Sequence, residues 1–262
     1  MDMFWKKFYR LLVLLPYLAA VSCSVKEDRS VCPCTLVLDM SCVDSQLVPE
    51  ADLFVTSKGS LEYQDKLSFD NMSDEYVISV PRKKLHLSVW TASDCNLPSG
   101  GMEIPLGCDC PRMYMFDTDL DTFQDESEEV VEMHKNHCVM TVMTELGDRF
   151  VHDVRIVGNV SGYTCEGKPA GGKFEYLLNG NRYEDGWKVV LPRQVDASLS
   201  LLIDDGQGTV KSFSIGNYIV SSGYDWTTPD LEDITLSLDY ALTEVTIRIE
   251  GWESEFTYKV EI

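Results

Sequence analysis

The sequence predicts an all-β protein built from two antiparallel β-sandwiches. From Cys34 onward, apolar residues alternate with polar ones in short stretches, which is the period-two pattern of strands with one buried face. Turn-forming residues separate these stretches every 8–12 residues or so, and no helical stripe is evident apart from a possible turn at 239–243. The chain has 262 residues, which is long for one sandwich and suits two domains of about 100–130 residues.

The first 22 residues are expected to be a signal peptide. Lys6, Lys7 and Arg10 precede an apolar run over residues 11–21. At about 1.5 Å per residue, this run is too short to cross a hydrocarbon core of about 30 Å. It is therefore interpreted as the apolar region of a secretion signal and not as a membrane span.

Cys23 directly follows a small-residue site, Ala19, Ala20 and Ser22, and this arrangement resembles a bacterial lipobox. We expect cleavage before Cys23, acylation of its thiol, and a lipidated spacer over residues 23–33. The alternative is an ordinary signal peptide with an incidental cysteine.

A lysine and two acids follow the lipidation site. Lys26, Glu27 and Asp28 resemble the signal that sends lipoproteins of some anaerobic Gram-negative bacteria to the cell surface. We therefore expect the protein to be lipid-anchored in the outer membrane and to face the cell surface.

The charge of the chain excludes nucleic acid as a main partner. The net charge is −21, and because the leader carries +2, the mature chain falls to −23. Such a body repels phosphate and anionic headgroups, so the lipid on Cys23 is the expected membrane attachment. The hydrophobic content of 44% permits ordinary cores, and wholesale disorder is not expected.

The first half of the mature chain has three clear alternating stretches and then becomes irregular. Turn residues fill 96–101, and an acidic run with few apolar residues covers 117–129. We place the domain boundary after this run, near Glu132, so that residues 34–132 form the N-terminal sandwich. The alternating stretches are 36–42, 76–80 and 85–89.

Alternation resumes after the boundary, so residues 133–262 are expected to form the C-terminal sandwich. The turn Asn179-Gly180-Asn181 is a strong hairpin signal. The alternating stretches are 138–142, 154–156, 174–178, 187–191, 199–203, 213–215, 234–238, 245–249 and 256–262.

Cysteine spacing leaves three interpretations open. Eight of the nine cysteines remain beside Cys23, an even number that is compatible with disulfides in an exported protein. Strand-to-strand disulfides between two C-x-C pairs are favoured, and free buried thiols are the main alternative. A four-thiolate zinc site is least favoured, because structural zinc sites usually space their cysteines by two to four residues. The pairs are Cys32 with Cys34 and Cys108 with Cys110.

No catalytic signature is found. The chain contains no G-x-S-x-G, Walker loop, H-E-x-x-H or G-x-G-x-x-G pattern. The only close histidine pair, His134 and His137, is offset by three, which places the two rings on opposite faces of a strand. We therefore expect no enzymatic activity and no cofactor.

A weak calcium candidate lies within the acidic run. Five carboxylates match ligand positions of a calcium loop, but Thr122 stands at the sixth position, where the sharp turn demands glycine. A solvated acidic linker is the favoured interpretation. The carboxylates belong to Asp117, Asp119, Asp121, Asp125 and Glu128.

Aromatic residues offer a second candidate for ligand binding. Trp90 and Trp187 lie in apolar stretches and are expected in the core. Tyr224 and Trp226 follow a Ser-Ser-Gly turn and are the better exposed candidates for stacking on sugars.

Several segments together resemble the FimB-type anchor and accessory subunits of fimbrillin-type (type V) fimbriae. They are the head from Cys23 to the Cys-Pro of 32–33, LHLSVW at 85–90, DLEDI at 230–234 with LDY at 238–240, and TEVTIRIEGW at 243–252. The resemblance implies two transthyretin-like Greek-key sandwiches, fimbrial stalk or accessory subunits as partners, and a non-enzymatic role in anchoring or terminating the polymer.

The resemblance also gives the first strand a role. In stalk subunits of such fimbriae, a trypsin-like protease cuts after the first strand, and a neighbour's strand then fills the emptied groove. Residues 43–52 contain no Lys or Arg, so the first strand, about 35–42, should stay in its own sheet. A lipidated subunit with a filled groove accepts no donor strand and can only end a chain.

The C-terminal stretch is a candidate donor strand. It has a single covalent tether, so it can leave its sheet without opening a loop. The alternative is that the strand closes its own sandwich. The apolar residues of the candidate strand are Phe256, Tyr258, Val260 and Ile262.

The alternative function for the whole chain is that of a surface glycan-binding lipoprotein.

Overall fold

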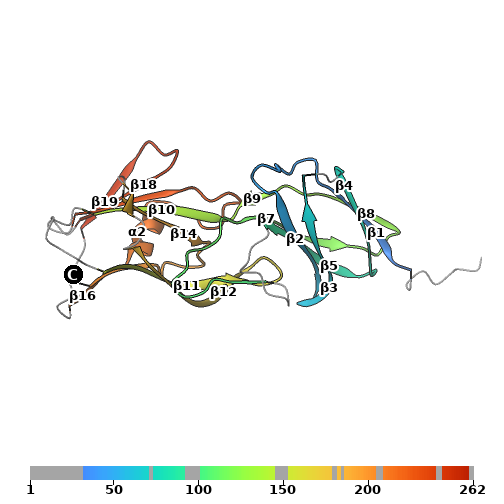
Figure 1. Ribbon diagram of the computed structural model, residues 1–262, viewed down its shortest axis with the longest axis horizontal. Coiled ribbons are helices and arrows are strands. Elements are labelled where there is room, and N and C mark those ends of the chain that lie inside the picture. The colour runs from blue at the N-terminus through green and yellow to red at the C-terminus, as the bar shows by residue number, and fades with distance from the viewer. Residues whose placement is uncertain are drawn as a thin grey trace, which may run out of the picture. The chain divides into compact units, whose positions relative to one another are not determined.

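A computed structural model shows a chain of β-strands with one α-helix among the residues it describes (Figure 1). The structure describes residues 32–70, 73–91, 101–144, 153–178, 182–183, 186–204, 209–239 and 244–259. The all-β prediction is confirmed. The signal peptide, Cys23 and the Lys26-Glu27-Asp28 signal lie outside the described residues. None of the helices within the described ranges has the length and apolar character that crossing a membrane requires.

The first sandwich consists of two sheets. The smaller has the order β4-β1-β8, formed by β1 (Cys34–Asp39), β4 (Glu75–Val80) and β8 (Glu126–Val130). The larger has the order β3-β2-β5-β7-β9, formed by β2 (Glu50–Ser57), β3 (Ser60–Ser68), β5 (Lys84–Thr91), β7 (Tyr114–Asp121) and β9 (His134–Lys135).

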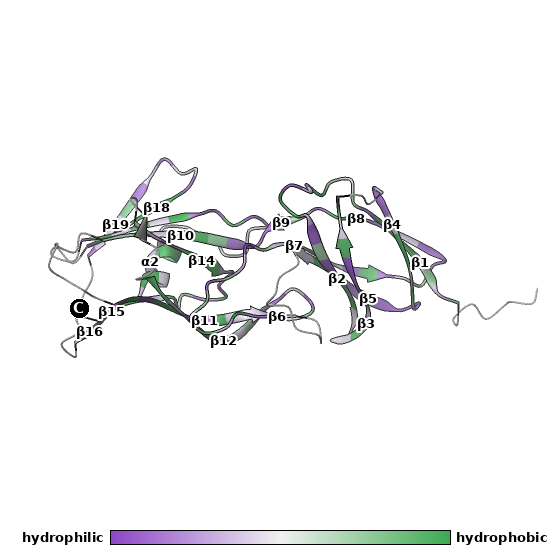
Figure 2. Ribbon diagram, viewed as in Figure 1, coloured by the Kyte–Doolittle hydropathy of each residue, from purple (hydrophilic) through white to green (hydrophobic). Residues whose placement is uncertain are grey.

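Alternation in the sequence fills the core between these two sheets. Every second residue of β1 is buried, and Leu36 and Leu38 are fully so. They pack in one hydrophobic cluster with Leu53, Leu87 and Val89 of the facing sheet. Figure 2 shows the resulting change between apolar and polar residues along the strands.

The second sandwich repeats this plan with additions. One sheet has the order β13-β14-β10-β17-β18-β19, formed by β10 (His137–Thr144), β13 (Arg182–Tyr183), β14 (Gly186–Pro192), β17 (Ile234–Asp239), β18 (Glu244–Ile249) and β19 (Glu255–Lys259). The other has the order β12-β11-β15-β16, formed by β11 (Asp153–Tyr163), β12 (Pro169–Leu177), β15 (Ser200–Asp204) and β16 (Val210–Phe213). Helix α2 (Ile215–Ser221) follows β16, and the short β6 (Met102–Glu103) pairs with β11.

The strand orders of the two sandwiches correspond. The order β4-β1-β8 matches β14-β10-β17, and β3-β2-β5-β7 matches β12-β11-β15-β16. In both, the first strand pairs antiparallel on one side and parallel on the other, through β1–β8 and β10–β17. The hairpin β18–β19 has no counterpart among the described strands of the first sandwich.

The second core extends onto the first sandwich. The outer face of the larger sheet carries Phe54, Trp90 and Met115, which belong to the second hydrophobic cluster. Phe54 and Trp90 pack with their ring centroids 4.8 Å apart. The sandwiches thus share apolar surface, and residues 33–262 form one compact unit.

One expectation about the middle of the chain needs correction. The acidic run is not a linker, because its residues build the end of β7 and most of β8. The segment before β7 packs with the second core through Met102, Ile104 and Met113. The boundary near Glu132 stays a prediction.

The expected disulfide between the two C-x-C pairs is not formed. Cys34 belongs to the first hydrophobic cluster and Cys110 to the second. Cys32 and Cys108 are exposed free thiols, and Cys34 is a buried one. Burial raises the pKa of the Cys34 thiol, which keeps it protonated and unreactive.

Candidate functional site

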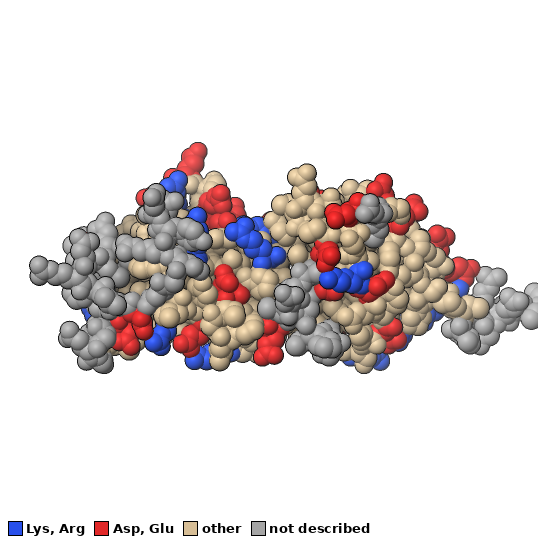
Figure 3. Space-filling model, viewed as in Figure 1, with Lys and Arg blue, Asp and Glu red and all other residues tan. Residues whose placement is uncertain are grey.

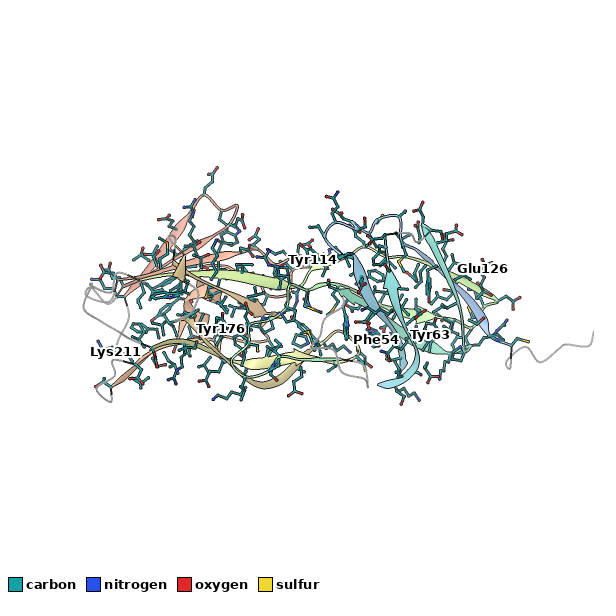
Figure 4. The ribbon with its side chains drawn as sticks, viewed as in Figure 1. Phe54, Tyr63, Tyr114, Glu126, Tyr176 and Lys211 are labelled. Carbon is teal, nitrogen blue, oxygen red and sulfur yellow. The ribbon has the colours of Figure 1, made fainter. Side chains whose placement is uncertain are left out.

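The turn between β11 and β12 docks on the outer face of the first sandwich. The hydroxyl of Ser88 donates a hydrogen bond to the Cys165 carbonyl at 2.7 Å. The His86 ring lies beside it, with Nδ1 2.8 Å from Asp119 Oδ1 and Nε2 3.1 Å from the Glu166 carbonyl. These contacts fix the turn against β5 and β7. In Figure 4, the labelled Phe54 and Tyr114 mark the same sheet.

Gly167 allows this turn to approach β7 closely. Its φ of +75° lies in the left-handed region, and an added Cβ would stand 2.8 Å from the Met115 sulfur. Any side chain here would strain the backbone, and the Met115 side chain would have to move to make room for it. Glycine is therefore required by the backbone conformation.

A cleft of about 860 Å³ opens beside this contact, and we call it the junction cleft. Its walls come from β7 and β9, the β11–β12 turn, the loop 193–197, the end of α2, and the loop 224–229. This volume lies within the range of about 300–1,000 Å³ usual for small-molecule sites. Its lining combines planar polar side chains with apolar ones.

Arg193 organises one wall of the junction cleft. Its guanidinium donates to the side-chain oxygen of Asn136 at 2.5 Å and to the main-chain carbonyls of Trp226, Thr228 (2.8 Å) and Pro229 (3.0 Å). Burial lowers the pKa of Arg193. No carboxylate among the described residues forms an ion pair with it, and its hydrogen bonds there all go to carbonyl oxygens.

No sequence signal marked Arg193, because its partners in the loop are main-chain carbonyls 33 to 36 residues later in the chain. Main-chain acceptors carry no residue identity, so a residue pattern cannot reveal them.

Tyr224 and Trp226 line the cleft but are not the exposed platform that we expected. Their exposed fractions are 5% and 6%, and their rings pack edge to face at 4.7 Å. Tyr224 donates to the Glu232 carbonyl at 2.7 Å, and burial raises the pKa of its hydroxyl. The indole nitrogen of Trp226 is buried without a partner among the described residues.

Two aspartates in the cleft are held as carboxylates. Asp225 accepts hydrogen bonds through Oδ1 from the main-chain N–H of Thr227 at 2.8 Å and from its hydroxyl at 2.7 Å. Asp196 accepts from the Ser198 N–H at 2.9 Å and from the Asn159 amide at 2.8 Å. These bonds lower the pKa of both carboxyl groups.

The calcium candidate is not assembled. Asp117, Asp119 and Asp121 lie on one face of β7, and residues two apart in a strand are about 7 Å apart, too far to converge on one ion. Asp119 faces His86, Asp125 is paired with Arg82, and Glu128 is on β8. No group of three ligands suited to a metal occurs in the part of the chain that the structure describes.

The first strand lies where the sequence places it. β1 is the central strand of its sheet, and its register runs from Cys34 opposite Val80 to Asp39 opposite Glu75. Parallel pairing with β8 completes the other side. The groove of the first sandwich is thus filled by the chain's own strand.

The candidate donor strand lies in its own sheet over the described residues. β19 pairs antiparallel with β18. Tyr258 stacks on Tyr218 of α2 with centroids 5.0 Å apart, and Phe256 meets Trp252 at 6.3 Å. Val260 and Ile262 lie outside the described residues. Over the described residues, β19 is the edge strand of its own sheet.

Charged side chains of both signs are visible on this face of the molecule. In Figure 3, Asp and Glu are spread over both sandwiches, with small groups of Lys and Arg between them. The full chain carries a net charge of −21.

The fold is shared with fimbrial and adhesin proteins of Bacteroidales. The fimbrial anchor protein Mfa2 from Porphyromonas gingivalis matches with a TM-score of 0.60 at 13% identity, covering 84% of this chain and 98% of its own. A proposed polysaccharide-binding protein from Bacteroides thetaiotaomicron matches with a TM-score of 0.59 at 11% identity, covering 87% and 98%.

A proposed adhesin from Bacteroides ovatus matches with a TM-score of 0.56 at 11% identity, covering 86% of this chain and 95% of its own. No family model and no curated protein matches the sequence. At these identities, the likeness establishes the two-sandwich fold of such surface proteins for this chain.

Proposed function

We propose that this chain is a non-enzymatic surface lipoprotein that anchors or terminates a fimbrial polymer in the outer membrane. The observation that carries the proposal is the position of β1, which lies between β4 and β8 in its sheet. Its residues Cys34, Leu36 and Leu38 are fully buried in the core. A subunit whose groove is filled by its own strand cannot accept a neighbour's strand there. Its fold is that of a fimbrial anchor protein, which supports the same role.

Retention of β1 follows from the sequence next to it. Residues 43–52 lack Lys and Arg, so a trypsin-like protease has no cleavage site between β1 and the start of β2. The experiment is to place an arginine at Gln46, in the exposed turn after β1, and to treat cells with trypsin. If the filled groove is what ends the polymer, the cleaved variant should accept a further subunit, whereas the wild type should not. A cleaved variant that still ends the polymer contradicts this part of the proposal.

Membrane attachment is proposed to depend on Cys23. Cys23→Ala should abolish acylation and release soluble protein, and lipid labelling with cell fractionation measures both. A variant that remains lipid-labelled and membrane-bound rejects the assignment.

Surface display is proposed to depend on Lys26, Glu27 and Asp28. With all three replaced by alanine, the lipoprotein should stay on the inner leaflet of the outer membrane, where protease added to intact cells cannot reach it. Unchanged cleavage by that protease would place the export signal elsewhere.

Contact with the fimbria is proposed to use the C-terminal strand. Deleting residues 255–262 should leave a folded, lipidated protein at the surface while fimbriae detach into the medium. A matched control replaces exposed Glu255 and Lys259 with glutamine, which keeps the strand and its apolar residues. Because β19 packs on α2, circular dichroism of the deletion variant is needed. An unfolded protein, or fimbriae that remain attached, would show that the strand is structural.

A second candidate function is that of a surface glycan-binding lipoprotein. The junction cleft favours it, and a neighbour in fold is a proposed polysaccharide-binding protein. Pull-down from solubilised outer membrane separates the two functions, because a fimbrial anchor co-purifies with fimbrial subunits.

A further inference from the structure

We propose that the junction cleft binds a short, neutral saccharide. This inference deepens the second candidate function by giving it a site and a ligand class, and it does not depend on the fimbrial role. It rests on the polar groups of the cleft, their charge balance, and one buried donor.

The lining has the composition that polyhydroxyl ligands require. Planar polar groups present donors and acceptors in fixed directions, and apolar side chains supply surface for the C–H faces of a sugar ring. The apolar rim includes Phe116 and two exposed valines, Val195 and Val220, with exposed fractions of 63% and 46%. The planar polar residues are Asp117, His134, Asn136, Arg193, Gln194 and Asp225.

Several of these groups keep hydrogen-bonding capacity. Asp225 uses Oδ1 for Thr227, and no bond within the described residues occupies its Oδ2. His134 directs Nδ1 to the Asp230 carboxylate at 3.1 Å, and no bond within the described residues uses its Nε2. Arg193 has five N–H groups, and its bonds to described residues use four of them.

The cleft therefore offers both acceptors and a donor. A hydroxyl group can donate and accept at once, which suits this mixture better than a ligand with acceptors alone, such as phosphate. Sites that hydrogen-bond a hydroxyl also reject analogues that lack it.

The charges of the lining nearly cancel. Asp117, Asp196 and Asp225 are opposed by Lys168 and Arg193. This near balance contrasts with the whole chain, which carries −21. A local field close to zero favours a neutral ligand over an anionic or strongly basic one.

The Trp226 indole supplies an independent observation. The side chain lines the cleft, its exposed fraction is 6%, and its N–H has no partner within the described ranges. Buried polar groups are nearly always hydrogen-bonded to protein, water or ligand. A hydroxyl-bearing ligand bound next to Trp226 would supply the partner that this donor lacks.

The test is a titration of the full mature chain, labelled on its valine methyl groups and monitored by NMR. Maltose, cellobiose and lactose are added separately to about 20 mM, since a small neutral ligand of this kind is expected to have a Kd on the order of 1 mM. The methyl signals of Val195 and Val220 should shift with at least one disaccharide. The equally exposed Val77 and Val210, which lie outside the cleft, serve as internal controls.

Two variants in the cleft and one control variant outside it sharpen the test. Trp226→Phe removes the indole donor and also reduces the volume of the buried ring, so affinity should fall roughly tenfold, and the unfolding midpoint measures the separate cost of the smaller side chain. Asp225→Asn should weaken binding by a similar factor. Asp74→Asn removes an exposed carboxylate outside the cleft and should leave binding unchanged.

Three outcomes of this titration would reject all or part of the proposal. No valine shift with any of the three disaccharides overturns the inference and leaves the fimbrial proposal untouched. Shifts at Val77 or Val210 without shifts at Val195 and Val220 retain glycan binding but reject the cleft as its site. A response to an alanine tripeptide, added as a control at the same concentration, with none to the sugars would show a peptide groove and reject the saccharide.

Discussion

The two sandwiches have corresponding strand orders, but they differ in whether further strands cover the same edge of the sheet. In the first, the strand parallel to the central strand is β8, and no further strand pairs with it among the described residues. In the second, the corresponding strand β17 is covered by the hairpin β18–β19. An uncovered edge invites pairing with other chains, so each sandwich needs a way to manage it.

The first sandwich protects its edge by charge. β8 carries Glu126, Glu128 and Glu129 within five residues. The second sandwich protects β17 by adding strands, and the new edge strand β19 has Glu255 and Lys259 at its ends. The same topology thus protects this edge in two ways, and only the second sandwich adds strands beyond the one that pairs parallel to the central strand.

The connections before these edges differ as well. β7 reaches β8 through residues 122–125, where the Thr122 hydroxyl lies 2.7 Å from the Pro81 carbonyl and 2.8 Å from that of Lys83. β16 reaches β17 through α2 and the loop that Arg193 holds. The longer connection builds a wall of the junction cleft, so the candidate ligand site arises where the second sandwich departs from the first.

The largest effect should come from Trp90, because it joins the two sandwiches. Trp90→Ala removes a fully buried ring from the second core and should cost about 3–5 kcal/mol of unfolding free energy, measured in urea. Hydrogen exchange should rise in β11 and β15 as well as in β5. Phe123→Ala, at a 58% exposed position, is the control and should change stability by no more than about 0.5 kcal/mol. Exchange that rises only in the first sandwich would argue against a shared core.

Leu36 tests whether β1 is as integral to its sandwich as β10 is to the second. Leu36→Ala and Met140→Ala each truncate a fully buried side chain in a central strand and should each cost about 2–5 kcal/mol. Chemical denaturation of the two variants under the same conditions provides the comparison. A cost below about 1 kcal/mol for Leu36→Ala alone would mean that β1 is only loosely held.

His137 should give the second sandwich a pH dependence of its own. The ring is buried, its Nδ1 is 2.9 Å from the Met113 carbonyl, and burial lowers its pKa below the ordinary 6.5. As the pH falls below about 6.5, the unfolded chain takes up this proton first, so stability is lost by at most about 1.4 kcal/mol per pH unit. Above that pH both states are neutral and the contribution is constant.

Thermal unfolding at pH 7.5 and 5.5 measures the effect of His137. His137→Gln keeps a donor for the carbonyl and should flatten the difference between the two pH values. An unchanged difference in this variant would assign the pH dependence to other groups.

The smallest effects are expected at surface ion pairs on the equivalent edge hairpins, one pair exposed and the other half-buried. Lys66 and Glu50 lie 2.8 Å apart on β3 and β2, and Arg155 and Glu175 lie 3.8 Å apart on β11 and β12. Double-mutant cycles should give about 0.2–1 kcal/mol for each pair, and less in high salt. A coupling well above this range in either hairpin would show that its edge depends on charge more than on packing.

Alternation predicted the strands well because one buried face leaves a period-two record in the sequence. Leu85, Leu87 and Val89, for example, fill the first core as expected. The other face of β5 was harder to interpret, because Ser88 and Trp90 are both buried there against a second sandwich. A strand with two buried faces loses its alternation, and nothing local shows what covers it.

The site was less predictable than the fold. The acidic composition at 117–129 suggested a linker, yet Asp117 and Asp119 stand on the exposed side of a strand whose Leu120 is buried. Trp226 followed turn residues and was expected to be exposed, but its loop folds back onto Arg193. Both errors have the same cause, since long-range contacts decide burial in loops and at strand ends.

The parallel pairing of β1 with β8 has a mechanical consequence. The chain enters β1 at Cys34, leaves β8 at Val130, and these two points lie at opposite ends of the paired strands. Tension applied between them acts along the strands, so the evenly spaced backbone hydrogen bonds share the load and must rupture together. Peeling, in which bonds open one after another, would require both pulling points at the same end. The first sandwich is therefore built to withstand a sustained pull along its length, and its lifetime under force is set by the rate of this shearing step.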